Sequence, residues 1–153
     1  MSDTPDDHDL PENAEDMICF ALYSASHALG RAYQPLLRDL GLTYPQYIAL
    51  MVLWREGTVP VGTICKRMRL DPSTVTPLLK RLEGLGLVMR RRGETDERQV
   101  FVSLTEAGSA LRARAPDITR CIIGATGKDM AALERLVAEL SELRDAVTAN
   151  TTT

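Results

Sequence analysis

Residues 70–98 combine short hydroxyl side chains with many cations, in an order that suits duplex DNA. The start of a predicted helix carries hydroxyls and a proline, followed by two cations: Ser73, Thr74, Thr76, Pro77, Lys80 and Arg81. Such hydroxyls can bond base edges or phosphates, a proline ring can contact a thymine methyl, and the cations can pair with phosphates. The next segment carries four arginines and an aspartate: Arg90, Arg91, Arg92, Asp96 and Arg98.

The arginines of this second segment predict contacts with the DNA backbone and with a narrow minor groove, which attracts arginine. Asp96 is placed to orient Arg98 through a charge-assisted hydrogen bond. Each residue alone also fits a solvated, cation-rich hairpin on a protein-interaction domain. The ordered set favours DNA binding.

A helix, a turn, a second helix and a hairpin must position these residues. Spacings of i, i+3, i+4 and i+7 predict a short helix with one buried face: Val61, Ile64, Cys65 and Met68. Asp71 is the predicted N-cap and Pro72 the first residue of the next helix, which runs to Leu85 before Gly86. Two strands, near residues 87–92 and 99–104, follow. The sequence thus predicts a mainly α fold with a small β hairpin, and a winged helix-turn-helix over residues 43–104.

Long helical segments flank this winged module. Apolar spacings predict a first helix over residues 13–40, in which Pro35 is expected to cause a kink or a break. Thr43 and Gln46 form a predicted capping box, and Thr105 is the predicted N-cap of the segment 105–149. These two flanking segments carry more apolar surface than a small winged core can cover. We therefore expect them to be dimerisation helices within one domain over residues 13–153.

The charge is distributed unevenly along the chain of 153 residues, whose net charge is −3. Residues 1–12 are acidic and are expected to form a disordered arm. Seven acids and no base fall within residues 1–16, which leaves 18 basic against 14 acidic residues in the remainder. Residues 66–98 hold nine Lys or Arg against five acids. The local basic surface, and not the total charge, governs contact with phosphates.

Three cysteines, with no CxxC motif and no Cys/His cluster, argue against a disulfide scaffold and a metal site. The apolar runs are too short to span a membrane, and no cationic leader precedes one at the N-terminus. We expect a protein of a reducing cytoplasm, without a cofactor.

Two segments resemble the MarR family of dimeric bacterial regulators. They are residues 71–87 and Asp96-Glu97-Arg98, the latter followed by Leu104-Thr105-Glu106-Ala107-Gly108. The resemblance covers nearly the whole chain after residue 13. It implies a homodimer that binds a pseudo-palindromic operator on double-stranded DNA, and it says nothing about the signal.

Three upstream segments are similar to the OhrR subgroup, repressors that sense organic hydroperoxides. They are residues 19–26, 33–37 and 41–47. The resemblance implies that Cys19 is the peroxide-reactive thiol and that Tyr33 and Tyr44 hydrogen-bond its sulfur. Tyr23 also falls on a tyrosine of the subgroup.

The residues by themselves leave two interpretations of Cys19 open: a small buried hydrophobe or a sensor thiol. Phenol donors stabilise a thiolate, but Cys19 lies about two turns from the predicted helix start, so the helix dipole should contribute little. Tyr33 is fourteen residues on, roughly 21 Å along a continuous helix. If the two residues meet, the partner chain must supply Tyr33, and the pocket forms at the dimer interface.

The other two cysteines differ in their predicted roles. Cys65 lies on the apolar face of its helix and is interpreted as a core residue. Some OhrR-like proteins carry a second cysteine that resolves the sulfenic acid, but this chain has Gly124 at the matching position. Cys121, one turn earlier, is either a displaced resolving thiol or inert, in which case a small cellular thiol caps Cys19.

Three functions follow for comparison. The first is a repressor that releases its operator when an organic hydroperoxide oxidises Cys19. The second is a MarR-like regulator controlled by a phenolic or other small molecule. The third is a thiol peroxidase, which we disfavour because no cationic or threonine-bearing loop surrounds Cys19, and His8 and His27 fit solvated or packing roles. We therefore expect no enzyme.

Overall fold

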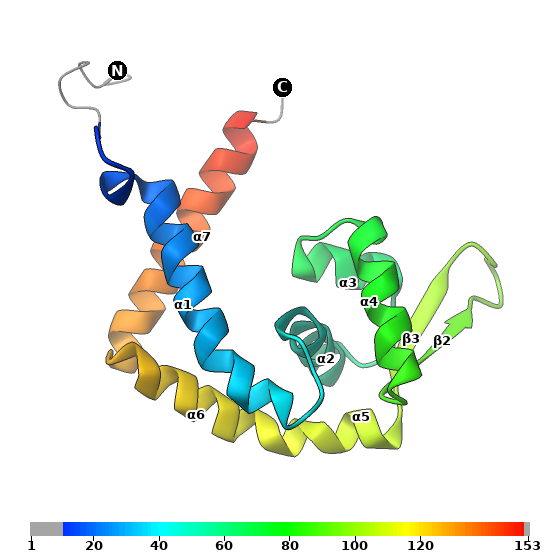
Figure 1. The fold of residues 1–153 in the computed structure, drawn as a ribbon. Helices are drawn as coiled ribbons and strands as arrows, with labels where there is room; N and C mark the ends of the chain where they lie inside the picture. Colours follow the sequence, from blue (N-terminus) through cyan, green and yellow to red (C-terminus); the bar gives the residue numbers. More distant parts are fainter. Residues whose placement is uncertain (1–10, 152–153) are drawn as a thin grey trace. The chain divides into compact units, whose positions relative to one another are not determined.

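The predicted winged helix-turn-helix is present in the computed structural model, which describes residues 11–151 (Figure 1). Most of the predicted acidic arm, including His8, lies outside the described residues. The chain divides into two units, one ending at Arg112 and the other beginning at Ala113. The first unit holds the helix-turn-helix, the hairpin and the residues predicted to contact DNA.

The N-terminal helical segment begins later than the sequence predicts. A short 3₁₀ helix, η2 (Ala14–Asp16), precedes α1 (Ile18–Arg38), because Met17 between them has an extended backbone. Pro35 lies inside α1 and does not break it. It stands in the last turn of the helix, where little of the hydrogen-bond ladder remains to be interrupted.

The capping box at the start of α2 (Tyr44–Glu56) is confirmed. The Gln46 side-chain oxygen accepts from the Thr43 backbone N–H at 2.9 Å, and the Thr43 hydroxyl accepts from the Gln46 N–H at 3.4 Å. These bonds satisfy Gln46, the one buried polar residue of the core among those described. The apolar face of α2 lies within the core of the first unit and includes Tyr47, Leu50 and Leu53.

The helix-turn-helix consists of α3 (Val61–Met68) and α4 (Pro72–Gly84). Arg69 turns the chain between them in the left-handed region, with φ of 55°. Asp71 occupies the N-cap position as predicted, but its side chain makes no capping hydrogen bond. One face of each helix is buried: Ile64, Cys65, Val75, Leu78, Leu79 and Leu82. The opposite face of α4 is therefore left for solvent or a ligand.

The hairpin strands are β2 (Val88–Arg92) and β3 (Val100–Leu104), each one residue shorter than predicted. A third strand, β1 (Val59–Pro60), pairs with β3 and was not predicted. The antiparallel sheet has the order β1-β3-β2, with Val102 of β3 opposite both Val59 and Arg90. Strand β3 is therefore central, and the buried Val102 fixes the hairpin to the core.

The base of the hairpin is fixed to α5 (Glu106–Ala110) by short contacts. The Thr105 hydroxyl donates to the Gly86 carbonyl at 2.6 Å and accepts from the Gly108 N–H at 3.1 Å, which confirms Thr105 as an N-cap. The Trp54 indole N–H of α2 donates to the Gly108 carbonyl at 2.9 Å. These bonds hold α2, α5 and the hairpin base together.

The predicted C-terminal segment is divided into several helices. After α5 come the 3₁₀ helix η3 (Leu111–Arg114), α6 (Ala115–Thr126) and α7 (Met130–Thr151). Pro116 lies in the first turn of α6, where a missing N–H is tolerated. Within residues 11–151 no helix is long and apolar enough to cross a membrane.

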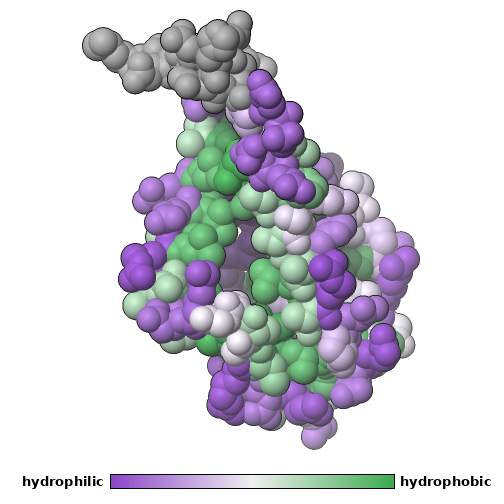
Figure 2. Space-filling view, turned by 60° about the vertical axis from the view of Figure 1, so that its left-hand side comes forward, coloured by the Kyte–Doolittle hydropathy of each residue, from purple (hydrophilic) through white to green (hydrophobic). Residues whose placement is uncertain are grey.

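Apolar side chains reach the surface of this single chain (Figure 2). On α1 the exposed large hydrophobic residues include Ile18, Phe20, Leu22, Tyr23 and Leu29. On α7 they include Met130, Leu136, Val137, Leu140 and Val147. Surfaces of this kind are characteristic of protein interfaces.

Candidate DNA-binding surface and sensor site

The exposed face of α4 carries most of the residues predicted to contact bases and phosphates. Its exposed members are Ser73, Thr74, Pro77, Lys80 and Arg81. Thr76 is half-buried and lines a groove of about 350 Å³ with Leu79, Arg90 and Arg98. Because the buried residues of α4 point into the core, this face is the part of the helix available to a DNA groove.

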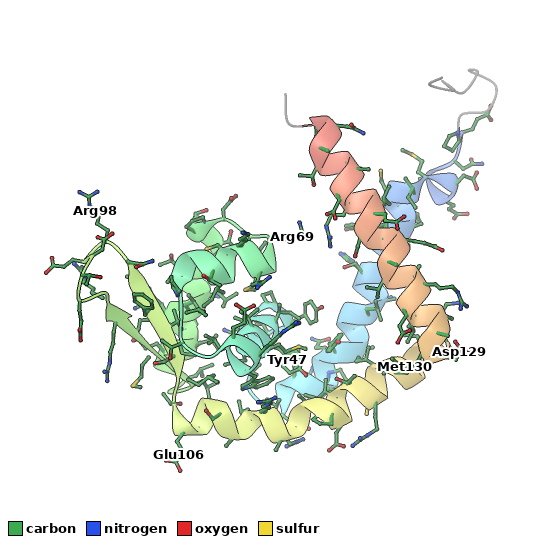
Figure 3. All side chains as sticks on the ribbon, turned by 180° about the vertical axis from the view of Figure 1, so that it is seen from behind. Tyr47, Arg69, Arg98, Glu106, Asp129 and Met130 are labelled. Atoms are coloured by element: carbon green, nitrogen blue, oxygen red, sulfur yellow. The ribbon has the colours of Figure 1, made fainter. Side chains whose placement is uncertain are left out.

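The loop between β2 and β3 presents Arg98 to solvent. Figure 3 shows Arg98 at the tip of the hairpin. Asp96 holds the loop through its own backbone carbonyl, which accepts from the Gln99 N–H at 3.1 Å, and through its carboxylate. That carboxylate accepts from the Arg98 backbone N–H at 3.0 Å, so Asp96 orders the backbone of Arg98 and not the guanidinium we had expected it to orient.

The three consecutive arginines of β2 have different environments. Arg91 and Arg92 are exposed, whereas Arg90 is partly buried and bonded to Glu83 of α4. Glu83 accepts from the Arg90 Nε at 3.0 Å, from Nη2 at 2.8 Å and from the backbone N–H at 3.1 Å. The Arg90 hydrogen bonds lower the pKa of Glu83 below its ordinary value, so the pair is ionic at neutral pH.

Tyr33 and Tyr44 come together at the C-terminal end of α1. Their ring centroids are 4.8 Å apart, and Tyr33 also lies 6.3 Å from Tyr47. Burial, followed by the neighbouring phenols Tyr44 and Tyr47, raises the pKa of Tyr33. Its hydroxyl is therefore protonated at neutral pH and is able to donate a hydrogen bond.

A cavity of about 680 Å³ adjoins this tyrosine pair. Its polar lining includes His27, Arg31, Gln34 and Thr43, and Leu37 and Leu42 add apolar surface. The cavity is large enough for a small organic molecule. Tyr23, nearer the start of α1, lies against His27 with ring centroids 4.2 Å apart.

Cys19 is exposed in the first turn of α1, closer to the helix start than predicted. Because α1 is continuous from Ile18 to Arg38, Cys19 and Tyr33 are separated by roughly 21 Å of helix. Cys19 does not meet the tyrosine pair within one chain.

The other two cysteines are also free thiols. Cys65 is buried, and burial raises the pKa of its thiol, which keeps it protonated and unreactive. Cys121 is exposed on α6. In the described part of the chain, no group of three or more His, Cys, Asp or Glu residues is arranged to hold a metal ion.

Two features of the site were not predicted from the sequence. Glu83 was missed because it is seven residues from Arg90, across a turn, where no local spacing rule applies. The second is a row of aromatic rings: Tyr47 lies 5.8 Å from Trp54, edge to face, and Trp54 bonds Gly108. Figure 3 labels Tyr47 on α2. Its position on an apolar helix indicated core packing only.

Comparison with known proteins defines the class. A family model described as transcriptional regulator SarA/Rot matches residues 31–114, more than half of the chain. Among solved structures, reduced AbfR of Staphylococcus epidermidis bound to DNA has a TM-score of 0.76 and 29% identity, and the match covers 86% of this chain and 90% of that one. AbfR has also been solved in an overoxidized form on DNA and with a disulfide formed. The chain belongs to this MarR-type family of winged-helix regulators, and it is a DNA-binding transcriptional regulator.

Two curated relatives are more similar in sequence. The organic hydroperoxide resistance transcriptional regulator of Bacillus subtilis is 43% identical over 131 residues, which cover 84% of this chain and 89% of that protein. The transcriptional regulator TtmR of Methylorubrum extorquens is 44% identical over 137 residues, 90% of this chain and 70% of that protein. Both are described as regulators and not as enzymes.

Proposed function

We propose that this regulator is a homodimeric repressor that senses organic hydroperoxides through Cys19 and releases its operator when that thiol is oxidised. The observation that carries the proposal is the placement of an exposed Cys19 at one end of α1 and a contacting Tyr33–Tyr44 pair at the other. The similarity to the Bacillus subtilis hydroperoxide regulator supports the same assignment.

A sensor pocket built from these residues needs two chains. Since roughly 21 Å of continuous helix separates Cys19 from Tyr33, an antiparallel arrangement of two α1 helices would bring Cys19 of one chain to the tyrosine pair of the other. The exposed apolar residues of α1, including Ile18 and Phe20, supply surface for such a contact. Tyr23, exposed on the same helix, is a third candidate donor.

The chemistry requires a thiolate and a phenol donor. The Cys19 thiolate attacks the terminal peroxide oxygen, which keeps its hydrogen, and the O–O bond breaks. The departing alkoxide takes a proton from solvent, which replaces the one that the thiol lost, and leaves as the alcohol. The cysteine has then given two electrons and become a sulfenic acid. Hydrogen bonds donated by the hydroxyls of Tyr33 and Tyr44 would stabilise the thiolate before this step. The added oxygen changes the size and hydrogen bonding of the sulfur and disturbs the tyrosine pair. The cavity of about 680 Å³ would admit the organic part of the peroxide.

A row of packed rings offers a route from the tyrosine pair to the DNA-binding unit. Tyr33 neighbours Tyr47, Tyr47 contacts Trp54, and Trp54 donates to Gly108 beside the hairpin base. A shift of Tyr33 would therefore reach the base of the hairpin through direct contacts. The two winged modules of a dimer must match half-sites roughly 34 Å apart, so a small rotation would weaken binding to a pseudo-palindromic operator.

In this proposal the contacts to DNA come from α4 and the hairpin. Ser73, Thr74, Thr76 and Pro77 would read bases, while Lys80, Arg81, Arg91 and Arg92 would contact phosphates. Arg98, at the tip of the loop that Asp96 orders, would enter the minor groove.

The test is a mobility-shift assay with an operator selected from random-sequence duplexes by the wild-type protein. We expect Cys19→Ser to bind this DNA within about twofold of wild type and to be unaffected by cumene hydroperoxide, which releases the wild type. Tyr33→Phe, which keeps the ring and removes the donor, should be oxidised more slowly. If the peroxide releases Cys19→Ser as readily as the wild type, Cys19 is not the sensor.

The role of Cys121 is tested on the same peroxide-treated protein by a separate measurement. A resolving Cys121 would attack the sulfenic acid, form a disulfide with Cys19 and expel water. A non-reducing gel would then show a crosslinked dimer in the wild type and none in Cys121→Ser. With a small thiol instead, both proteins would give a mixed disulfide visible by mass spectrometry.

A second candidate function is control by a phenolic or other small molecule, which the cavity beside Tyr33 and Tyr44 favours. It predicts that such a ligand releases the operator from wild type and from Cys19→Ser equally, and that no sulfenic acid forms at Cys19. If cumene hydroperoxide releases DNA from neither wild type nor Cys19→Ser, while a phenol releases it from both, the second function is supported and the first is refuted.

A further inference from the structure

One carboxylate connects the DNA-facing helix α4 to the hairpin. Glu83 is the penultimate residue of α4, and its carboxylate accepts three hydrogen bonds from Arg90 in the middle of β2. One oxygen accepts from the backbone N–H of Arg90, and the other accepts from both Nε and Nη2. The same carboxylate therefore holds the strand backbone and the side chain of one residue.

The direction of the strand explains why Arg90, and not its neighbours, makes this contact. Alternate residues of a strand point to opposite faces, so Arg90 shares a face with the buried Val88, while Arg91 shares the other face with the exposed Met89. The Arg90 side chain is 24% exposed. Arg91 pairs with Phe101 of β3 through the strand ladder, but within the described residues its side chain has no hydrogen bond or ion pair. The two arginines are therefore unequal, although adjacent in sequence.

We propose that Glu83 is a positioning residue for DNA binding: it fixes the angle between the hairpin and α4, and Arg90 acts through it and not as a free phosphate contact. A planar guanidinium bonded through two of its nitrogens defines a direction, which a flexible ammonium does not. If Arg90 moved to a DNA phosphate, it would leave an unpaired carboxylate close to the DNA. A phosphate contact by Arg91 or Arg92 would leave no carboxylate unpaired.

The variants Arg90→Lys and Arg90→Gln separate the two roles, with Arg91→Lys and Arg91→Gln as matched controls. Fluorescence anisotropy measures binding to a labelled duplex that the wild-type protein has selected from a random library, over a range of KCl concentrations. Arg90→Lys keeps the positive charge but loses the two guanidinium nitrogens that bond Glu83. We expect it to weaken DNA binding roughly tenfold. Its salt dependence should equal that of wild type. Arg91→Lys should keep the wild-type salt slope and lose less affinity than Arg90→Lys, and Arg91→Gln should lower the salt slope by about 0.9.

Two further variants test whether Glu83 and Arg90 act as one unit. Glu83→Gln keeps an oxygen for the Arg90 backbone N–H but loses the ionic bonds, and it should weaken binding about as much as Arg90→Lys. The double variant Glu83→Gln/Arg90→Gln should be no weaker than the worse single variant, because both remove the same contact. Thermal unfolding of each variant establishes that the compared proteins are folded.

The opposite pattern would overturn the proposal. If Arg90→Lys binds like wild type while Arg90→Gln lowers the salt slope by about 0.9, Arg90 is an ordinary phosphate contact. If Glu83→Gln binds DNA more tightly, removal of a negative charge outweighs any positioning effect. Additive losses in the double variant would also show that the two residues act separately.

Discussion

The substitution Gly108→Ala should destabilise the protein strongly, although it adds a single methyl group. Gly108 is buried at the start of α5. A Cβ at this position would lie 2.0 Å from the Leu87 carbonyl oxygen, 3.0 Å from the Leu87 carbonyl carbon and 3.2 Å from Leu104 Cδ2. Two of these three atoms belong to backbone, which cannot rotate away.

Both sides of the contact are also held by hydrogen bonds. The Leu87 carbonyl accepts from the Thr105 N–H at 3.1 Å, and the Gly108 carbonyl accepts from the Trp54 indole at 2.9 Å. Overpacking of this kind costs about 1–3 kcal/mol, and weakening two hydrogen bonds adds about 1 kcal/mol each. The better helix propensity of alanine offsets about 1 kcal/mol. The net loss is about 2–4 kcal/mol, or a fall in Tm of roughly 5–15 °C.

The measurement is urea unfolding followed by circular dichroism, at one protein concentration because the proposed dimerisation would contribute to stability. The matched control is Gly62→Ala in α3, where nothing lies within 4 Å of the added Cβ. The control should be neutral or more stable by up to about 1 kcal/mol. If Gly108→Ala unfolds within about 0.5 kcal/mol of wild type, the backbone contact at Leu87 does not constrain this position as argued.

Two further predictions concern titratable groups. Cys65 should resist alkylation by iodoacetamide at neutral pH, because it is buried and the pKa of its thiol is raised, whereas the exposed Cys121 should react. Mass spectrometry measures both rates, and equal rates would contradict the interpretation of Cys65 as an unreactive core residue. Hydrogen bonds from Arg90 lower the pKa of Glu83 below its ordinary value, so the stability that this pair contributes is present at neutral pH and is lost as the pH falls through the lowered pKa. Between about pH 6 and about pH 3, Glu83→Gln should therefore lose less stability than wild type, and parallel curves would refute the linkage.

The elements that local chemistry defines were predicted well from the sequence. The capping box of Thr43 and Gln46, the N-cap at Thr105 and the helix-turn-helix all follow from spacings within a few residues, and the structure has them. Strand β1 was missed because two residues carry no periodicity and pair with a strand forty residues away. The start of α1 was placed too early because the extended backbone at Met17 has no signature in the sequence.

In the candidate site too, local spacing predicted which residues lie on an element but not which residues of distant elements contact them. The sequence identified the residues of the α4 face and the arginine at the tip of the hairpin. It treated Arg90, Arg91 and Arg92 as equivalent, because a run of like residues says nothing about which of them meets a carboxylate on another element. It also assigned Asp96 to the Arg98 guanidinium, whereas the structure has it bonded to the Arg98 backbone.

The sequence by itself determined the class of fold, the basic segment that we predict to face DNA, and the unusual combination of Cys19 with Tyr33 and Tyr44. These depend on residue type and on spacing along the chain. Only the tertiary structure decided which charges are paired and which aromatic rings touch, and it showed that a continuous α1 separates Cys19 from Tyr33. Such facts depend on the approach of distant segments, which the burial of a shared core fixes and which local spacing does not encode.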